Sequence, residues 1–232
     1  MNCSSTAAIA MDSGASIRID PDVEDAGLRF TAQVSLDALA ALEKEFGDGA
    51  TVSYGMLITP TAFANKAGDV TAEALDAWAE SDEMKDRFGT DKAYVDVVAT
   101  PESWYKGQEG EFAASLNGIQ SMLTTAFSGR AYIKVEVDGA TVYTLYAAYS
   151  ETDNSRVFTD ILSAALNDVL YTNDNGTTWY VDEACATAAD LTKVDPSEYT
   201  TNLSGDAAVK KYSCYTAAQY ADLTALSGNI TQ

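Results

Sequence analysis

The chain has 232 residues, of which 47% are hydrophobic, so it is long and apolar enough to bury a core. Fourteen Lys and Arg residues stand against thirty-five Asp and Glu residues, and the net charge of -21 argues against nucleic acid and anionic membrane surfaces as partners. Histidine is absent, which removes the usual general base and the commonest zinc ligand, and no stretch reaches the roughly 18 apolar residues of a membrane-spanning helix. We therefore expect no nucleic acid, no membrane insertion, no metal and no cofactor.

Short runs of alternating apolar and polar residues dominate the first part of the chain, and this period of two is typical of half-buried strands. The runs are ASIRID at 15–20, GLRFTAQV at 27–34, TVSYGMLI at 51–58, KAYVDVVAT at 92–100 and GEFAASL at 110–116. The clearest hairpin is predicted over 130–149, with its turn at Asp138-Gly139. Its inward-facing residues are expected to be Ala131, Ile133, Val135 and Val137, which leaves Arg130 and Tyr132 on the polar side.

Apolar residues that recur every three to four positions predict the helices. Ser35 is expected to cap the first helix, Gly47 to end it, and its apolar face comprises Leu36, Leu39, Leu42 and Phe46. A second helix is predicted over 71–84, with Trp78 on its core face. The longest helical stripe runs from Val157 to Leu170, and weaker helical patterns follow at 182–191 and 216–226.

The order of these elements predicts a fold that is mainly β with α. Around seven strands with two interposed helices favour a β-sandwich over residues 14–150. Residues 151–232 are expected to form a cluster of packed helices. No linker is obvious between the two regions, so we expect them to pack as one compact unit.

Several ordered motifs in the first two thirds of the chain carry a resemblance. They are GASIRID, AGLRFTAQV, YGMLITP, VVAT, FSGRAYIKV and YSETDNSR, within residues 14–166. In this order they resemble a module that recurs in exported, multi-domain cell-surface proteins of gut clostridia. The succession of sheet and helices, with a long C-terminal extension, is also similar to the starch-adherence proteins that a gut Ruminococcus assembles into its extracellular amylosome.

The resemblance implies a non-catalytic domain that binds α-glucan, meaning starch or maltooligosaccharides. It also implies a secreted protein at the bacterial cell surface, carried beside further modules or a dockerin. The composition agrees with export, because Lys and Arg are few and Thr, Ser, Asn and Tyr are abundant. The resemblance brings no sugar-contact motif with it, so candidate residues follow from side-chain chemistry.

A glucose ring offers apolar C–H surface for stacking on an aromatic ring, and hydroxyl groups for planar polar side chains. Two stretches combine such groups. Trp179 and Tyr180 follow the polar turn TNDNGT, and Trp104 and Tyr105 lie in the polar segment PESWYKGQEGE. Partial burial beneath a neighbouring loop is the alternative for each tryptophan.

A third group of candidates lies where the sheet region passes into the long helix. Tyr149, Asp153, Asn154 and Arg156 would line a cleft at this junction if the helices fold back on the sheets, and Arg130 could face it. The alternative is structural: Asp153 or Asn154 caps the long helix, and Arg156 pairs with a carboxylate.

Other functions are weaker interpretations of the same residues. A calcium loop with Gly176 at its sixth position would place Tyr171 where the first Asp should stand, so the register fails and an Asn175-Gly176 turn is favoured. A glycoside hydrolase needs only two carboxylates, which thirty-five acids supply without specificity. A structural or adhesive surface module without a sugar site remains the other alternative. Cys185 and Cys214 either pair or serve as small buried residues.

Overall fold

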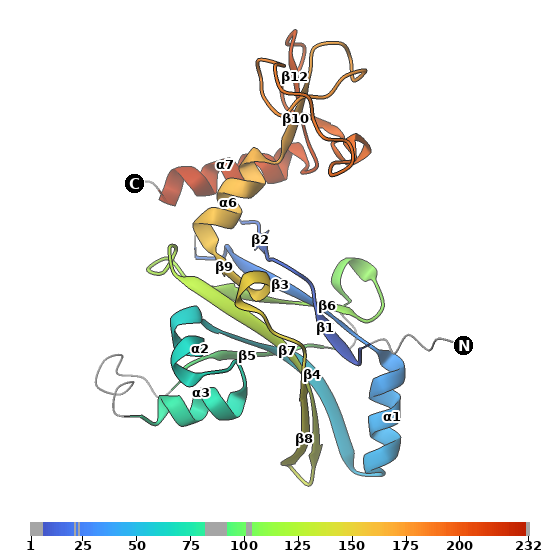
Figure 1. The fold of residues 1–232 in the computed structure, drawn as a ribbon, viewed down its shortest axis with the longest axis vertical. Helices are drawn as coiled ribbons and strands as arrows, with labels where there is room; N and C mark the ends of the chain where they lie inside the picture. The colour runs from blue at the N-terminus through green and yellow to red at the C-terminus, as the bar shows by residue number, and fades with distance from the viewer. Residues whose placement is uncertain (1–6, 21, 23, 82–91, 101–103, 231–232) are drawn as a thin grey trace. The chain divides into compact units, whose positions relative to one another are not determined.

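The computed structural model describes residues 7–20, 22, 24–81, 92–100 and 104–230. The chain divides into two compact units (Figure 1). Unit 1 comprises Met1–Arg18 and Gly27–Phe158, and unit 2 comprises Ile19–Ala26 and Thr159–Gln232. The chain therefore passes from one unit to the other at residues 18–19, 26–27 and 158–159.

The first sheet of unit 1, sheet A, is antiparallel and built around β3 (Gly27–Val34). β6 (Glu111–Asn117) pairs along one edge of β3, while β1 (Ile9–Met11) and β2 (Ser16–Arg18) pair in turn with the other edge. Leu28, Phe30 and Ala32 of β3 are fully buried. The alternating run at 27–34 thus forms the half-buried strand that its period predicts.

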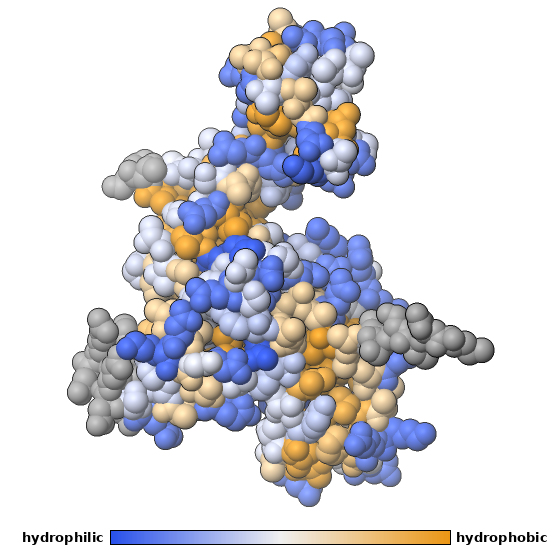
Figure 2. Space-filling view, in the orientation of Figure 1, coloured by the Kyte–Doolittle hydropathy of each residue, from blue (hydrophilic) through white to orange (hydrophobic). Residues whose placement is uncertain are grey.

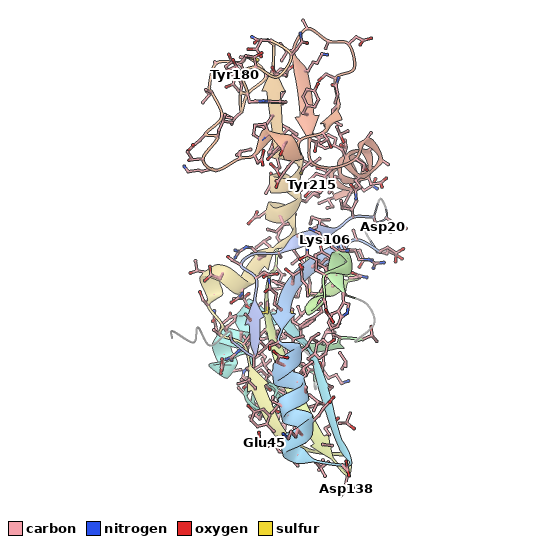
Figure 3. All side chains as sticks on the ribbon, turned by 90° about the vertical axis from the view of Figure 1, so that its right-hand side faces the viewer. Asp20, Glu45, Lys106, Asp138, Tyr180 and Tyr215 are labelled. Atoms are coloured by element: carbon pink, nitrogen blue, oxygen red, sulfur yellow. The ribbon has the colours of Figure 1, made fainter. Side chains whose placement is uncertain are left out.

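The second sheet of unit 1, sheet B, is also antiparallel. Its order is β5 (Val95–Val98), β4 (Ala50–Pro60), β7 (Ala126–Val137) and β8 (Ala140–Tyr146), and β9 (Ser155–Val157) pairs with the beginning of β7. β7 and β8 form the predicted hairpin, with Asp138 at its tip (Figure 3). Asp138 and Gly139 have φ of 52° and 77°, as a two-residue turn of type I′ requires.

Hydrophobic residues reach the surface near this tip (Figure 2), where Val142 is 50% exposed. The register of the hairpin shifts between Val135 and Glu136. This β-bulge sets Tyr132 opposite Tyr146, whereas an unbroken register from the turn would set it opposite Leu145.

β7 is buried on both faces. Ala131, Ile133 and Val135 are buried as predicted, but Tyr132 is also only 3% exposed, so its expected place on a polar face is wrong. The helices α2 (Thr61–Ala67) and α3 (Ala72–Ala79) supply the cover. A cluster on this side packs Leu57 and Tyr132 with Ala64, Val70, Leu75, Ala79 and Ala93. An alternating pattern of apolar and polar residues predicts one buried and one exposed face of a strand. It therefore fails for a strand whose second face is covered by helices.

Two helices of unit 1 begin at the expected caps. The Ser35 hydroxyl accepts a hydrogen bond from Ala38 N–H at 3.3 Å, and Gly47 ends α1 (Leu36–Phe46). The Thr71 hydroxyl accepts from Ala74 N–H at the start of α3. The predicted helix over 71–84 ends at Ala79, and its positions 82–84 lie outside the described residues.

Sheets A and B contact each other through aromatic side chains. Phe30 of β3 lies against Gly129 of β7, and the rings of Tyr54 (β4) and Phe112 (β6) meet edge to face at 5.1 Å. With its antiparallel sheets and interposed helices, the chain is a mixed α/β protein.

Unit 2 holds more strand than predicted. α6 (Phe158–Asn167) ends earlier than the stripe to Leu170, because Val169 and Leu170 belong to β10 (Val169–Thr172). β10 pairs with β12 (Lys210–Ser213), which also pairs with β11 (Thr201–Asn202) after the short 3-10 helix η2 (Pro196–Glu198). The helix predicted at 216–226 is present as α7 (Ala217–Ile230).

The helix predicted at 182–191 is wrong. The Asp182 carboxylate accepts hydrogen bonds from the N–H groups of Ala186 and Thr187 at 3.0 and 2.7 Å, which closes a turn. Cys185 has φ of 52°, a left-handed conformation that a right-handed helix does not contain. Hydrogen bonds from backbone N–H groups to the Asp182 side chain thus take the place of the backbone hydrogen bonds of a helix.

Candidate functional site

Trp179 and Tyr180 lie in the irregular part of unit 2 (Figure 3 labels Tyr180). Backbone hydrogen bonds of 2.9 Å pair Tyr180 with Tyr171, and Asn175 and Gly176 turn the chain between them with φ of 58° and 88°. The half-buried Trp179 ring meets Tyr212 edge to face at 5.4 Å and lies close to Gly176. The stretch is therefore a closed turn, and its tryptophan packs against the turn and β12.

Trp104 and Tyr105 are half-buried at the 3-10 helix η1 (Tyr105–Gly107). The Trp104 ring stacks on Tyr54, with 6.3 Å between centroids and 4° between planes. The Tyr105 ring has the Arg29 guanidinium at 5.5 Å and the Lys106 ammonium at 5.2 Å. Trp78 packs against Phe63 at 4.7 Å beside the core cluster of α2 and α3. All three tryptophan rings thus have aromatic neighbours.

The structure brings together three of the candidates at the end of the sheet region. Tyr149, Asp153 and Asn154 line a hollow of about 430 Å³ with residues of β1. Asn154 is 3% exposed, and its side-chain oxygen accepts from Ser150 N–H at 3.0 Å. The Tyr149 hydroxyl lies 2.9 Å from the Ser128 hydroxyl. These polar groups hold the short helix α5 (Glu151–Asn154) in place.

The two arginine candidates do not line that hollow. Arg156 donates to the carbonyl oxygens of Thr152 and Ser155 at 2.8 and 2.6 Å. Arg130 donates to Ala147 O at 2.8 Å and forms a 2.7 Å ion pair with Asp69. Neither Asp153 nor Asn154 caps the long helix, since Ser150 caps α5 instead.

A second hollow, of about 230 Å³, lies over the face of sheet B that α2 and α3 cover; we call it the tyrosine pocket. Its floor includes Leu57 of β4, which is 1% exposed. Its walls come from α3, β5, β7 and β8. The lining residues that carry polar groups are Glu73, Tyr94, Asp96, Tyr132, Lys134, Thr141, Thr144 and Tyr146.

Each tyrosine of the pocket donates its hydroxyl to a carboxylate. Tyr132 donates to Asp96 at 2.7 Å, and Tyr146 donates to Glu73 at 3.0 Å while accepting from Ala72 N–H. Tyr94 donates to Asp76 at 3.3 Å. Each carboxylate has a second oxygen that can accept a further hydrogen bond.

These surroundings keep the tyrosines protonated. Burial, followed by Asp76, raises the pKa of Tyr94 to about 12. Burial also raises the pKa of Tyr146 to about 12, with Glu73 adding to the effect. The pKa of Tyr132 rises for the same reason, with Asp96 as its partner. The pocket therefore combines neutral rings with ionisable carboxyl groups.

Sequence patterns did not point to this pocket. Tyr132 and Tyr146 come from β7 and β8 and Tyr94 directly precedes β5, and the bulge in the hairpin decides that Tyr132 and Tyr146 face each other. Their ring centroids are 6.4 Å apart with 65° between planes. The sequence offered one signal: the predicted hairpin carries Tyr132 on one arm and Tyr146 on the other, one position away from direct pairing in an unbroken register.

Cys185 and Cys214 are both free thiols, so the disulfide alternative is not present. The alternative of two buried residues also fails, since Cys214 is exposed and Cys185 is half-buried. Within the described ranges, no cluster of three or more His, Cys, Asp or Glu side chains is arranged to hold a metal ion. Over the same ranges, no helix has the length and apolarity to cross a membrane.

Comparisons with protein-family models, with curated proteins and with solved structures gave no significant match for this chain.

Proposed function

We propose that this protein is a non-catalytic carbohydrate-binding domain that recognises α-glucan, and that the tyrosine pocket is its sugar site. In this proposal the domain is secreted, acts at the bacterial cell surface, and is carried beside further modules or a dockerin. Sheets A and B would form the β-sandwich of the resembled module. The supporting observation is the pocket itself, where two half-buried rings, Tyr94 and Tyr146, stand beside Glu73 and Asp96.

The chemistry of the pocket matches the two surfaces of a sugar. Tyrosine rings offer apolar area to the C–H face of a pyranose. The second oxygens of Glu73 and Asp96 can accept from sugar hydroxyls, while Lys134, Thr141 and Thr144 can donate to them. The volume of about 230 Å³ is below the roughly 300 Å³ at which pockets for drug-sized ligands begin, so it suits a single ring of a longer chain.

The tryptophans are weaker candidates for a stacking platform. Trp179 contacts Tyr212 and Gly176, and Trp104 stacks on Tyr54. A ring that already packs against protein has less surface for a ligand. Replacing either tryptophan should therefore leave sugar affinity unchanged.

Isothermal titration calorimetry with maltoheptaose, cellooligosaccharides and mannan tests the proposal. We expect binding of maltoheptaose alone, with micromolar affinity of about -7 to -8 kcal/mol. Tyr94→Ala should weaken binding by about 1 to 3 kcal/mol, and Trp179→Ala and Trp104→Ala serve as matched controls. The pocket assignment fails if only the tryptophan variants lose affinity.

Two other outcomes would replace the proposed function. No heat with any glycan would favour a structural or adhesive module. Release of shorter oligosaccharides that stops in Glu73→Gln or Asp96→Asn would establish a hydrolase, because that reaction needs a pair of carboxyl groups.

A further inference from the structure

The tyrosine pocket carries a surplus of negative charge. Two carboxylates, Glu73 of α3 and Asp96 of β5, line it, and Asp76 holds the hydroxyl of Tyr94 from α3. The single cation among the lining residues, Lys134, forms a 3.3 Å ion pair with Glu136. Its charge is therefore balanced by an acid on its own strand.

The rings of the pocket also suit a cation. The negative face of a tyrosine ring attracts ammonium and guanidinium groups within about 6 Å of its centre. One such contact already exists, because the Arg130 guanidinium lies 5.2 Å from the centroid of Tyr146. That arginine is itself paired with Asp69, so it does not offset Glu73 and Asp96.

The whole chain reinforces this preference. A net charge of -21 attracts cationic ligands and repels anionic ones over distances of about a Debye length. Glu73 and Asp96 are exposed at the pocket, so an ammonium group of a ligand can reach them, and salt should weaken this attraction.

From this geometry we infer that the tyrosine pocket selects sugars by charge: a ring bearing a protonated amine binds more tightly than a neutral ring, and an acidic ring binds least. The preferred ligand class is thus an amine-bearing glycan, such as one that contains 2-amino-2-deoxyglucose. This inference rests on the proposed sugar-binding function of the same pocket. It adds the charge of the ligand to that function.

Competition among glucosamine, glucose and glucuronic acid tests the charge rule, because the three rings share one shape. Affinities are measured by protein NMR at low salt, below neutral pH where the amine is protonated. Glucosamine should bind on the order of tenfold more tightly than glucose, and the preference should shrink as salt is added. Glucuronic acid should bind least.

Glu73→Gln keeps an oxygen acceptor and removes the charge. In this variant the ratio of glucosamine affinity to glucose affinity should fall most of the way towards one, whatever happens to the affinity for glucose itself. Glu45→Gln is the matched control, since it removes the same charge from α1, away from the pocket lining (Figure 3). The NMR spectrum of each free variant, compared with that of the original protein, shows whether the pocket stays folded.

The outcomes separate the charge rule from the proposed function. Equal affinity for glucose and glucosamine overturns the charge rule and leaves α-glucan binding intact. Binding of glucosamine without any binding of glucose or maltoheptaose supports the charge rule and overturns the α-glucan assignment. Absence of binding by all of these sugars overturns both.

Discussion

Gly129 of β7 lies against the ring of Phe30 in β3, so closely that an added β-carbon at residue 129 would be 2.9 Å from Phe30 Cγ. Both residues are buried, and Phe30 has no exposed surface. Sheets A and B therefore approach each other at a point where only a hydrogen atom fits.

Gly129→Ala should destabilise the protein, because the methyl group forces Phe30 or the backbone to move. Overpacking of this kind costs about 1 to 3 kcal/mol in the free energy of unfolding, which urea denaturation measures. Gly228→Ala is the control: that glycine lies within α7 with nothing within 4 Å of an added β-carbon. There we expect a gain of about 0.5 to 1 kcal/mol. Equal stability of Gly129→Ala and the original protein would contradict the close approach.

The tyrosine pocket predicts a loss of stability at alkaline pH. Tyr94 and Tyr146 each have a folded pKa of about 12, against the ordinary tyrosine pKa of 10.0. Because the folded state holds these protons more tightly, the stabilisation is complete below pH 10 and disappears as the pH rises towards about 12. Tyr146→Phe and Tyr94→Phe should each flatten the fall in unfolding free energy over this range. A fall of unchanged slope in both variants would show that other groups cause it.

Acid should disorder the turns around Trp179. The N–H of Thr178 lowers the pKa of Asp174 to about 2, and the N–H of Ala186 lowers the pKa of Asp182. A lowered folded pKa stabilises above the ordinary value of 3.8, and this contribution is lost as the pH falls through the folded pKa. Amide exchange at Thr178 and Ala186 should therefore quicken as the pH falls from about 4 to about 2, after correction for intrinsic rates. Asp182→Asn should quicken exchange at Ala186 at neutral pH as well, and protection there that survives this change would rule out the carboxylate cap.

The free thiols should react slowly at neutral pH. Partial desolvation of the sulfur, followed by the charge of Asp182, raises the pKa of Cys185, and partial desolvation followed by Asp168 raises the pKa of Cys214. Since the thiolate is the nucleophile, alkylation of both should accelerate as the pH rises above 9. Asp168→Asn should speed the reaction of Cys214 alone, which mass spectrometry of the labelled peptides can follow. Equal acceleration at both cysteines would point to general unfolding.

Elements that depend on neighbouring residues could be predicted from the sequence. The turn at Asp138-Gly139 needs left-handed conformations that these two residues adopt readily, and α1 needs a hydroxyl at Ser35 and a glycine at Gly47. Both signals are local. They therefore predict the turn and the helix ends correctly without knowledge of the long-range packing.

The candidate site could not be predicted because its members meet only through long-range packing. Tyr94 reaches the pocket through the pairing of β5 with β4, and Tyr132 through the cover of α2 and α3. Apolar content also misled at Val169 and Leu170, where burial within a strand produces the same pattern as burial on a helix. Apolar residues indicate which positions are buried, but they do not decide whether a helix or a strand buries them.

The three passages of the chain between units 1 and 2 have a consequence for dissection of the protein. Neither unit is one continuous stretch of sequence, so a gene fragment that stops at residue 158 still encodes Ile19–Ala26, a piece of unit 2. Ala26, which belongs to that piece, is completely buried. An isolated unit 1 therefore requires a new, short connection in place of residues 19–26.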